Sequence, residues 1–304
     1  RQLSEIVFAL SACLIVARAR PDVVVCSSPS LWSSSLVGPL CRGMRIPFAW
    51  EVRDLWPETQ VQMGVFAERS APAMLMRLLE RLSWWSAGVV ISVLPQADQY
   101  FAARFPSDSK DIVWIPNGAV WRRPMPVKRA SGVTRFGYAG SFNEANDVSS
   151  IVSAFSEVYE RFGPAVELCL LGQGPEEAEL RELASEMGCS VGVKFLGPVP
   201  RREVQSALSR MHVLVAAIHP SGLYRWGYSL NKLFDYFGSG RPVVLAAPGP
   251  YRPLGDGPTA GWHVESGDVS LMSHAMIAAV NCTDEELTVR GDLGSELLRS
   301  RYAI

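Results

Sequence analysis

The stretch that decides the fold is Ser229-Leu230-Asn231-Lys232-Leu233-Phe234-Asp235-Tyr236-Phe237, followed by Gly238-Ser239-Gly240-Arg241-Pro242-Val243-Val244. It predicts a helix over 230–238 with Ser229 as its N-cap, then a Gly-Pro break, then a buried strand over 243–247. Working outward in both directions, the same succession of helix, short break and buried strand recurs along most of the chain.

The charges of this helix are unusual. Lys232 falls in the first turn, where the helix dipole disfavours a cation, and Asp235 follows one turn later on the face that also carries Asn231. An anion at the helix start explains the lysine, because free backbone N–H groups and the ammonium would hold the same phosphate. Asp235 would then accept hydrogen bonds from sugar hydroxyls, which suits a nucleotide diphosphate sugar. A surface Lys–Asp pair explains the same residues equally well.

The order of elements predicts an α/β fold. Strands are expected over 22–27, 48–52, 89–93 and 112–115, and again over 136–139, 166–171, 193–196, 213–217 and 243–247, with helices between them. Fully buried runs separated by helices indicate parallel sheets covered on both faces. We therefore expect two Rossmann-like domains facing each other across a cleft, over 1–120 and 135–304. The polar, proline-rich residues 121–134 are the expected linker.

Bulk composition narrows the class of protein. The chain has 304 residues and a net charge of −1, which suits two domains and gives no electrostatic case for a nucleic-acid partner. The six cysteines are scattered without a CxxC pair, so no zinc or redox dithiol is expected and a reducing, cytoplasmic compartment is favoured. The four histidines are isolated, which favours a metal-independent mechanism without a cofactor.

Two features bear on membranes. The longest apolar run, 6–17, is about 12 residues and is expected to be too short to span a bilayer. Seven of the nine tryptophans lie in the first 121 residues, where an exposed subset would form a surface for peripheral membrane contact. The expected helix over 71–85 has an apolar set made of Leu75, Leu78, Leu79, Leu82 and Trp85.

Candidate donor-binding residues follow the predicted strands of the second half, because parallel strands place ligands at their carboxyl ends. They are Gly140, Ser141, Asn146, Gly172, Gln173, Leu196, Gly197, Arg225, Asn231, Lys232 and Asp235. The Gly172-Gln173-Gly174 run is half a dinucleotide fingerprint, but Glu177 replaces its third glycine. Ordinary strand–helix loops, a tight turn before Pro175 and a solvated Arg225 are the structural alternatives.

The first half has one comparable stretch, Trp50-Glu51-Val52-Arg53-Asp54-Leu55-Trp56-Pro57-Glu58. Three carboxylates beside one arginine at a strand end indicate either a role in binding or catalysis or a structural ion pair. We expect Arg53 or Asp54 to take part in catalysis, and Glu51, Glu58 and Ser28 to lie on the acceptor side. A structural brace between Arg53 and Glu51 or Glu58 is the alternative.

Taken together, these motifs resemble the family 4 glycosyltransferases, which have two Rossmann-like domains in the GT-B arrangement. The matching stretches are 52–58, 115–118, 138–140, 172–174, 195–199, 229–236 and 240–243. The similarity is greatest to the bacterial branch of L-fucosamine, colanic-acid and O-antigen transferases. By this resemblance the first domain holds the acceptor and the second holds the donor, the sugar is transferred with retention, and Asp235 replaces the family's second glutamate.

The chain also departs from that family. Gly227 stands where a glutamate is usual, and Ser141 and Asn146 replace the usual arginine and lysine, so that Lys232 and Arg225 are expected to compensate. The first strand with its glycine-rich loop, and the end of the terminal crossover helix, are expected to be missing, as in a fragment.

The function predicted from the sequence is transfer of a sugar from a UDP- or GDP-linked donor to a glycan or polyprenyl-linked acceptor, in bacterial surface polysaccharide biosynthesis. The enzyme would work in the cytoplasm or at the inner face of the plasma membrane. Two alternatives remain open, a non-catalytic nucleotide-sugar-binding fragment and a sugar-nucleotide epimerase on the same fold.

Overall fold

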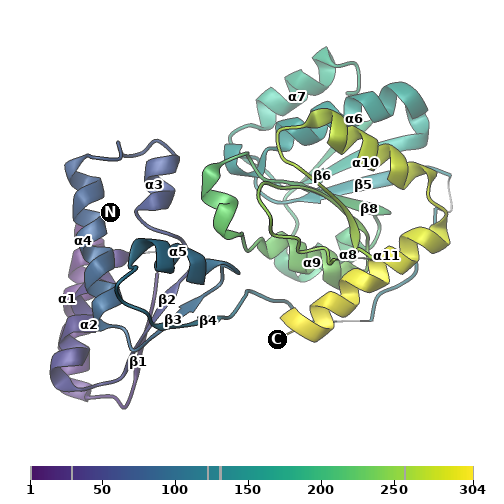
Figure 1. Cartoon of the computed structure of the whole chain (residues 1–304). Coiled ribbons are helices and arrows are strands. Elements are labelled where there is room, and N and C mark those ends of the chain that lie inside the picture. The colour runs from purple at the N-terminus through teal and green to yellow at the C-terminus, as the bar shows by residue number, and fades with distance from the viewer. Residues whose placement is uncertain (1, 29, 122, 130–131, 257, 304) are drawn as a thin grey trace. The chain divides into compact units, whose positions relative to one another are not determined.

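The computed structural model describes residues 2–28, 30–121, 123–129, 132–256 and 258–303. It divides into two compact units, unit 1 (Arg1–Pro116 with Ser221–Ser229) and unit 2 (Asn117–Pro220 with Leu230–Ile304). Each unit is built on one parallel sheet, as the alternation of strands and helices predicts (Figure 1). The division differs from the predicted one, because unit 1 ends four residues before 120 and also takes up nine residues from the second half. The predicted linker falls partly on Arg122, Ala130 and Ser131, which lie outside the described residues.

Unit 1 has four parallel strands in the order β1-β2-β3-β4. The strands are β1 (Val24–Ser27), β2 (Phe48–Val52), β3 (Val89–Ser92) and β4 (Asp111–Trp114). Its helices are α1 (Gln2–Ala19), α2 (Leu31–Met44), α3 (Glu58–Gln62), α4 (Ala71–Ser86) and α5 (Ala97–Arg104), with a short 3-10 turn at Gly222–Trp226. Helix α2 packs against both α1 and α4 (Figure 1). Aromatic rings fill the core, where Trp84 stacks on Phe101 with the ring centroids 4.9 Å apart.

The buried face of α4 differs from the predicted one. The structure buries Met76, Leu79, Glu80 and Trp84 and leaves Leu75, Leu78 and Trp85 exposed. The face shifts because Glu80 can be buried: its carboxylate accepts hydrogen bonds from the Tyr100 hydroxyl at 2.7 Å and from Arg104 Nε at 3.0 Å. These two hydrogen bonds offset part of the free energy that burying a carboxylate costs. A prediction based only on the spacing of apolar residues does not take this into account.

Helix α1 also corrects an expectation. It is 18 residues long and apolar enough to cross a membrane by length and composition, whereas the sequence suggested that the run was too short. Only about a tenth of it is buried inside the structure.

Unit 2 has six parallel strands in the order β10-β9-β8-β5-β6-β7. They are β5 (Thr134–Ala139), β6 (Val166–Leu171), β7 (Val193–Gly197), β8 (Val213–Ala217), β9 (Val243–Ala246) and β10 (Gly261–Val264). The helices are α6 (Val148–Phe162), α7 (Glu177–Glu186), α8 (Val204–Leu208), α9 (Asn231–Ser239), α10 (Val269–Asn281) and α11 (Asp284–Leu297). Short 3-10 turns cover Glu144–Asn146, Gly163–Ala165 and Arg201–Glu203, and a π turn covers Leu298–Tyr302.

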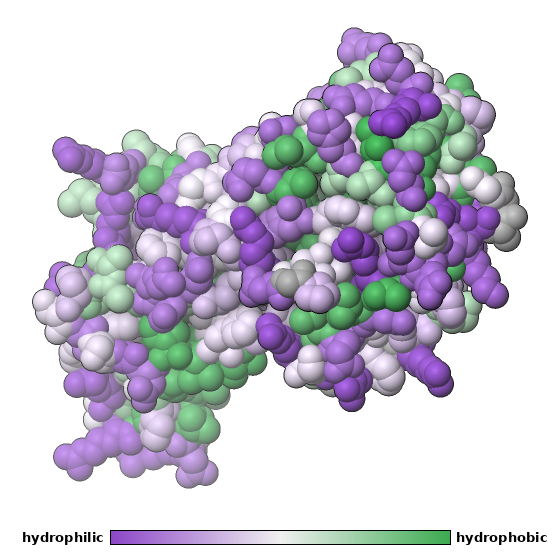
Figure 2. All heavy atoms as spheres, turned by 45° about the vertical axis from the view of Figure 1, so that its right-hand side comes forward, coloured by the Kyte–Doolittle hydropathy of each residue, from purple (hydrophilic) through white to green (hydrophobic). Residues whose placement is uncertain are grey.

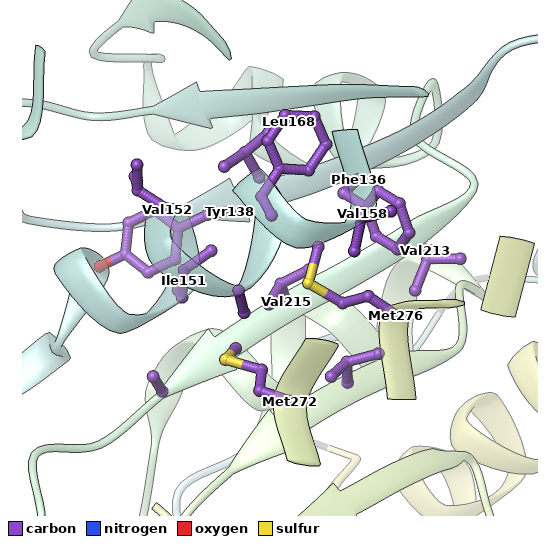
Figure 3. Packing of buried hydrophobic residues seen from close by; sticks show 14 of the residues in the cluster. Phe136, Tyr138, Ile151, Val152, Val158, Leu168, Val213, Val215, Met272 and Met276 are labelled. Atoms are coloured by element: carbon purple, nitrogen blue, oxygen red, sulfur yellow. The ribbon is translucent and has the colours of Figure 1, made fainter. Parts of the chain in front are cut away.

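One hydrophobic cluster of unit 2 lies on one face of this sheet, under α6 and α10 (Figure 3). Phe136 and Tyr138 of β5 and Val213 and Val215 of β8 meet residues of these two helices, among them Met276 (Figure 3). Strand β8 is buried at every position, which confirms a sheet covered on both faces.

One detail of the deciding stretch differs from the prediction. Helix α9 begins at Asn231 and its N-cap residue is Leu230, which makes no side-chain cap hydrogen bond, so the Ser229 N-cap is wrong. Outside this stretch, the helix expected between the strands over 193–196 and 213–217 is a 3-10 turn followed by the short helix α8. The prediction of Lys232 in the first turn of α9 is confirmed.

Candidate functional site

A cavity of about 570 Å³ opens in unit 2 where the ends of β5 and β6 meet the start of α9. Its walls come from four segments: the ends of the two strands, the turn after β7, and the first two turns of α9. The lining residues are Ala139, Gly140, Ser141, Leu171, Gly172, Gln173, Pro198, Val199, Arg201, Val204, Asn231, Lys232, Asp235 and Tyr236. A cavity at the carboxyl ends of parallel strands is the place where this kind of fold binds ligands.

The Lys232 side chain is directed back over the end of β5 rather than into bulk solvent. Its Nζ donates hydrogen bonds to Asn146 Oδ1 at 2.7 Å and to the Tyr138 hydroxyl at 3.0 Å. The ammonium also lies 4.4 Å from the centroid of the Tyr138 ring. An ammonium has three N–H donors, so these two contacts leave a third for a ligand oxygen.

Burial lowers the pKa of Lys232 to about 7. Both of its hydrogen-bond acceptors are neutral oxygens, so neither offsets the cost of removing the charge from water as an anion would. The first N–H groups of α9 have no acceptor within the helix, and they point in the same direction as the positive end of the helix dipole. Lysine and helix start together form a site for an anion with two or more oxygens.

Two glycines bring the backbone close to this site. A Cβ at Gly140 would lie 3.0 Å from Lys232 Nζ and 2.8 Å from the Tyr138 hydroxyl. A Cβ at Gly172 would lie 1.8 Å from the carbonyl oxygen of Gly140. Any larger residue at either position would displace the strand ends or the lysine, so the sequence needs glycine here for close packing.

The second turn of α9 carries Asp235 and Tyr236. Asp235 is only 7% exposed, and its Oδ2 accepts a hydrogen bond from Arg201 Nη1 at 2.5 Å. The buried Tyr236 hydroxyl accepts a hydrogen bond from the backbone N–H of Ala139 at 2.8 Å and lies 3.3 Å from the carbonyl oxygen of Val215. Tyr236 therefore fixes α9 against β5 and β8, which sets the position of Lys232 and Asp235.

The structure brings most of the predicted donor residues together. Gly140, Ser141, Gly172, Gln173, Asn231, Lys232 and Asp235 all line the cavity. Leu196 and Gly197 do not line it, because the chain reaches the wall two residues later, at Pro198 and Val199. Asn146 also lies outside the lining, and its amide is used internally: Oδ1 accepts from Lys232 and Nδ2 donates to the Ser141 carbonyl at 2.9 Å.

Arg225 belongs to the 221–229 segment that groups with unit 1, and it is not among the residues of the cavity. Its guanidinium lies over the Trp226 ring, 4.6 Å from the centroid. In the same segment Gly227 has φ +85°, and a Cβ there would lie 2.4 Å from Pro95. The glutamate that the resemblance leads one to expect at this position would therefore be strained and would clash.

The predicted residues of unit 1 also gather at strand ends. Ser28 follows β1, and its Oγ accepts a hydrogen bond from the backbone N–H of Arg53 at 2.9 Å. Glu51 lies in β2 opposite Ser27, and Glu58 begins α3. Desolvation raises the pKa of Asp54, and the neighbouring Arg53 opposes this rise. A carboxyl group that keeps its proton more readily than usual is suited to acid–base work.

Sequence reasoning missed Arg201, although the same signal that singled out Lys232 was present. Arg201 is a cation at the start of a helical turn, directly after Pro200.

A larger cavity in unit 2, of about 690 Å³, has the opposite character. Six carboxylates line it: Glu144, Asp147, Glu176, Glu179, Glu182 and Glu186. Such a surface repels a phosphate, which leaves the Lys232 cavity as the better anion site. Within the described parts of the chain, no group of three or more His, Cys, Asp and Glu side chains could hold a metal ion.

Comparison with solved structures gives the same fold. HepE from Anabaena, solved in complex with UDP, superposes with a TM-score of 0.75 at 13% identity, over 97% of this chain and 78% of that protein. Sucrose-phosphate synthase from Thermosynechococcus elongatus gives 0.71 at 18% identity, over 97% and 73%. The lipopolysaccharide outer core galactosyltransferase WaaB gives 0.70 at 14% identity, over 97% and 75%. A comparison of the sequence with curated proteins finds no match.

Family profiles match both halves of the chain. The profile described as "Glycosyl transferase 4-like domain" matches residues 1–118, and the one described as "Glycosyl transferases group 1" matches residues 133–281. The second match contains the whole wall of the Lys232 cavity. With glycosyltransferase profiles over both halves and two parallel-sheet units that match GT-B structures, the chain is a glycosyltransferase of the GT-B fold.

Proposed function

We propose that this glycosyltransferase takes its sugar from a UDP- or GDP-linked donor and passes it to a glycan or polyprenyl-linked acceptor in bacterial surface polysaccharide assembly. The single observation that carries the proposal is Lys232, a cation at the start of α9 whose charge is disfavoured by burial and which lines a cavity at the strand ends. Complexes of HepE with UDP and with UDP-glucose support a UDP-linked donor, and WaaB supports a surface polysaccharide role.

In this proposal each wall of the cavity takes one part of the donor. The backbone N–H groups of Asn231 and Lys232, together with the Lys232 ammonium, hold the diphosphate. Asp235 binds the ribose, and Pro198 and Val199 lie beside the base. Gly140 and Ser141 allow the backbone to approach the diphosphate closely.

The reaction we propose retains the anomeric configuration and needs no metal ion. The bond from the acceptor oxygen to the anomeric carbon forms on the face from which the diphosphate leaves, and the leaving phosphate takes up the acceptor proton. Lys232 and the helix-start N–H groups stabilise the negative charge that develops on the diphosphate. Arg53 or Asp54 would act near the reacting sugar, and Ser28, Glu51 and Glu58 would bind the acceptor.

Isothermal titration calorimetry with UDP and GDP tests the donor site. We expect Lys232→Met to weaken binding by about 10- to 100-fold, which is the usual contribution of a charge-assisted hydrogen bond. Lys194→Met is the matched control, because Lys194 is an exposed lysine of unit 2 whose Nζ is bonded to the Val191 carbonyl outside the cavity. Equal nucleotide affinity in wild type and Lys232→Met would remove the basis of the proposal.

We further propose that the protein works at the inner face of the plasma membrane through α4. The exposed residues Met74, Leu78 and Trp85 follow one another at helical spacing, with Arg77 and Arg81 between them. Figure 2 shows that hydrophobic residues are exposed among hydrophilic ones at the surface of the molecule. Apolar side chains interspersed with arginines suit an anionic lipid surface.

Vesicle sedimentation tests the membrane contact. Wild type should bind vesicles of anionic phospholipid more strongly than vesicles of phosphatidylcholine, and the double variant Leu78→Asn/Arg81→Gln should lose most of that binding. Val191→Asn, a change to an exposed apolar residue in unit 2, serves as the control. Equal binding of the double variant and wild type would exclude α4 as the contact.

A further inference from the structure

The carboxylate of Asp235 is already engaged in the structure. Arg201 Nη1 donates to its Oδ2 at 2.5 Å, and both residues line the Lys232 cavity. The two residues differ sharply in environment, because the side chain of Asp235 is 10% exposed whereas that of Arg201 is 74% exposed. A long, exposed arginine is thus held to a nearly buried acid at the wall of the cavity.

Stability of the fold does not account for this pair. An ion pair with one exposed partner contributes about 0–1 kcal/mol, and ordering an arginine side chain costs up to about 2 kcal/mol of conformational entropy. The next residue offers a contrast: Arg202 lies outside the cavity, is 84% exposed, and pairs with its own neighbour Glu203. Two adjacent arginines therefore differ mainly in which side chain they meet and in whether they line the cavity.

The hydrogen-bonding capacity of the pair is incomplete. Within the described part of the chain, the guanidinium of Arg201 makes one hydrogen bond, although it carries five N–H donors. Asp235 Oδ1 makes none with a side chain there, since the only bond to this carboxylate is the one at Oδ2. The pair thus presents an acceptor oxygen and several donors side by side.

A hydroxyl group is the ligand that fits this combination, because it donates one hydrogen bond and accepts others. Two neighbouring hydroxyls, such as the 2′ and 3′ groups of ribose, would use both halves of the pair at once. A base carbonyl or a phosphate oxygen could use Arg201 but would be repelled by Asp235.

We propose that Arg201 is a positioning residue for the nucleotide, and that it forms with Asp235 a clamp for the ribose diol. Arg201 holds Oδ2 so that Oδ1 is fixed to accept from one hydroxyl, and its unused N–H groups donate to the hydroxyl oxygens. The clamp makes the site selective for ribonucleotides over deoxyribonucleotides. The inference rests on the proposed function, because it takes the cavity to be the donor site.

Nucleotide calorimetry with deoxy analogues tests the clamp. The probes are UDP, 2′-deoxy-UDP and 3′-deoxy-UDP, or the corresponding guanosine series if GDP binds more tightly. In wild type at least one deoxy analogue should bind about tenfold more weakly than the ribonucleotide. In Arg201→Gln the affinity for the ribonucleotide should fall by about tenfold while the affinity for that analogue changes little, so that the discrimination disappears.

The double variant separates positioning from simple charge balance. Asp235→Asn should abolish the same discrimination. The double variant Arg201→Gln/Asp235→Asn should bind the ribonucleotide no more weakly than the weaker-binding single variant, because either single change already removes the whole clamp. Arg201→Lys keeps the charge without the planar fork and should restore only part of the discrimination. Arg202→Gln is the control and should match wild type for every ligand.

Two outcomes would overturn the clamp. Either Arg201→Gln leaves the ratio of the affinities for the three nucleotides unchanged, or wild type does not discriminate against either deoxy analogue. If Lys232→Met still weakens UDP in those cases, only the clamp fails and the donor site stands. If wild type binds neither UDP nor GDP, the proposed function and the clamp fail together.

Discussion

Lys232 carries a positive charge in an environment that disfavours it. Its ammonium is mostly removed from water, its two protein partners are neutral oxygens, and its pKa falls to about 7. The aromatic face of Tyr138 offsets part of this cost, since cation–π contacts contribute about 0.5–2 kcal/mol. A bound diphosphate would restore the full charge, so lysine protonation and nucleotide binding should be linked.

This linkage gives a prediction for pH. With the free pKa near 7, about nine in ten Lys232 side chains are neutral at pH 8, and a bound dianion raises the pKa again. Nucleotide affinity should therefore fall as pH rises above 7, by up to about tenfold per pH unit. Binding at pH 8 should also take up close to one proton, measured by calorimetry in two buffers of different ionisation enthalpy. Lys232→Met should show neither effect, and constant wild-type affinity from pH 7 to 9 would contradict the linkage.

At this scale the sequence identified Lys232, Asp235 and the glycines because each stands out in its local sequence pattern. A cation at a helix start and a glycine at a strand end are visible without coordinates. Ser229 was the wrong N-cap because helix α9 starts one residue later than capping chemistry suggested. Arg201 was missed because its partner lies 34 residues away, and no local pattern connects the two.

Among the elements, α9 depends most on a single side chain. The Tyr236 hydroxyl is fully buried and satisfies the backbone N–H of Ala139 at the end of β5. Together with the bond from Lys232 to the Tyr138 hydroxyl, this contact connects α9 to the end of β5.

Replacing Tyr236 by phenylalanine should therefore destabilise the fold. The N–H of Ala139 would lose its partner, and leaving a buried donor unsatisfied costs about 1–3 kcal/mol. Urea denaturation measures this loss. Tyr159→Phe is the matched control, because Tyr159 packs on Phe155 and its hydroxyl makes no hydrogen bond within the described residues, so it should change stability by less than about 0.5 kcal/mol. Equal stability of Tyr236→Phe and wild type would show that the hydroxyl contact is dispensable.

Most strands and helices could be predicted, because most strands are short apolar runs in the sequence; β8 and β9 are buried at every position, whereas β1 and β4 are partly exposed. The misses have physical reasons. Strand β10 has only four residues and three of them are partly exposed, so it lacks the apolar signature. Helix α3 has only five residues and buries none, so it has no periodic pattern. The face of α4 was wrong because Glu80 is buried through its contacts with Tyr100 and Arg104, which come from a different helix.

For the molecule as a whole, the buried His212 and the partly buried His263 predict sensitivity to acid. Burial lowers the pKa of His212 and of His263 to about 4. His212 Nδ1 accepts a hydrogen bond from the backbone N–H of Arg135 at 2.8 Å, which a protonated nitrogen could not do. Because the unfolded chain binds protons at these groups near pH 6.5 and the folded chain does so only near pH 4, stability is lost as pH falls between these values.

The variant His212→Asn isolates this contribution, since an asparagine oxygen can accept the same bond without titrating. Between pH 7.5 and pH 5, wild type should lose about 2 kcal/mol more stability than His212→Asn, measured from urea denaturation at each pH. His274→Asn, a change to an exposed histidine, is the control and should follow wild type. Parallel loss in His212→Asn and wild type would assign the acid sensitivity to other groups.

At this scale the sequence predicts two units, each built on a parallel sheet. It does not predict that residues 221–229 pack with unit 1. That segment is nearer in sequence to β8 and α9 of unit 2, yet its ring contacts are to unit 1: Trp226 meets Tyr100 with the centroids 5.9 Å apart. The backbone N–H of Gln96 also donates to the Trp226 carbonyl at 3.2 Å. Such contacts between distant parts of the chain leave no periodic signal in the sequence.

The placement of Ser221–Ser229 has a practical consequence for anyone who would separate the halves. A boundary drawn after Pro116 severs the polypeptide once, but the amino-terminal piece would then lack the stretch that covers Tyr100 and Gln96. The carboxy-terminal piece would carry that stretch with nothing to pack against. A protein nicked after Pro116 should therefore elute as one particle under native conditions and resolve into two fragments only in denaturant. An isolated carboxy-terminal half would best be made with a short glycine–serine bridge from Pro220 to Leu230.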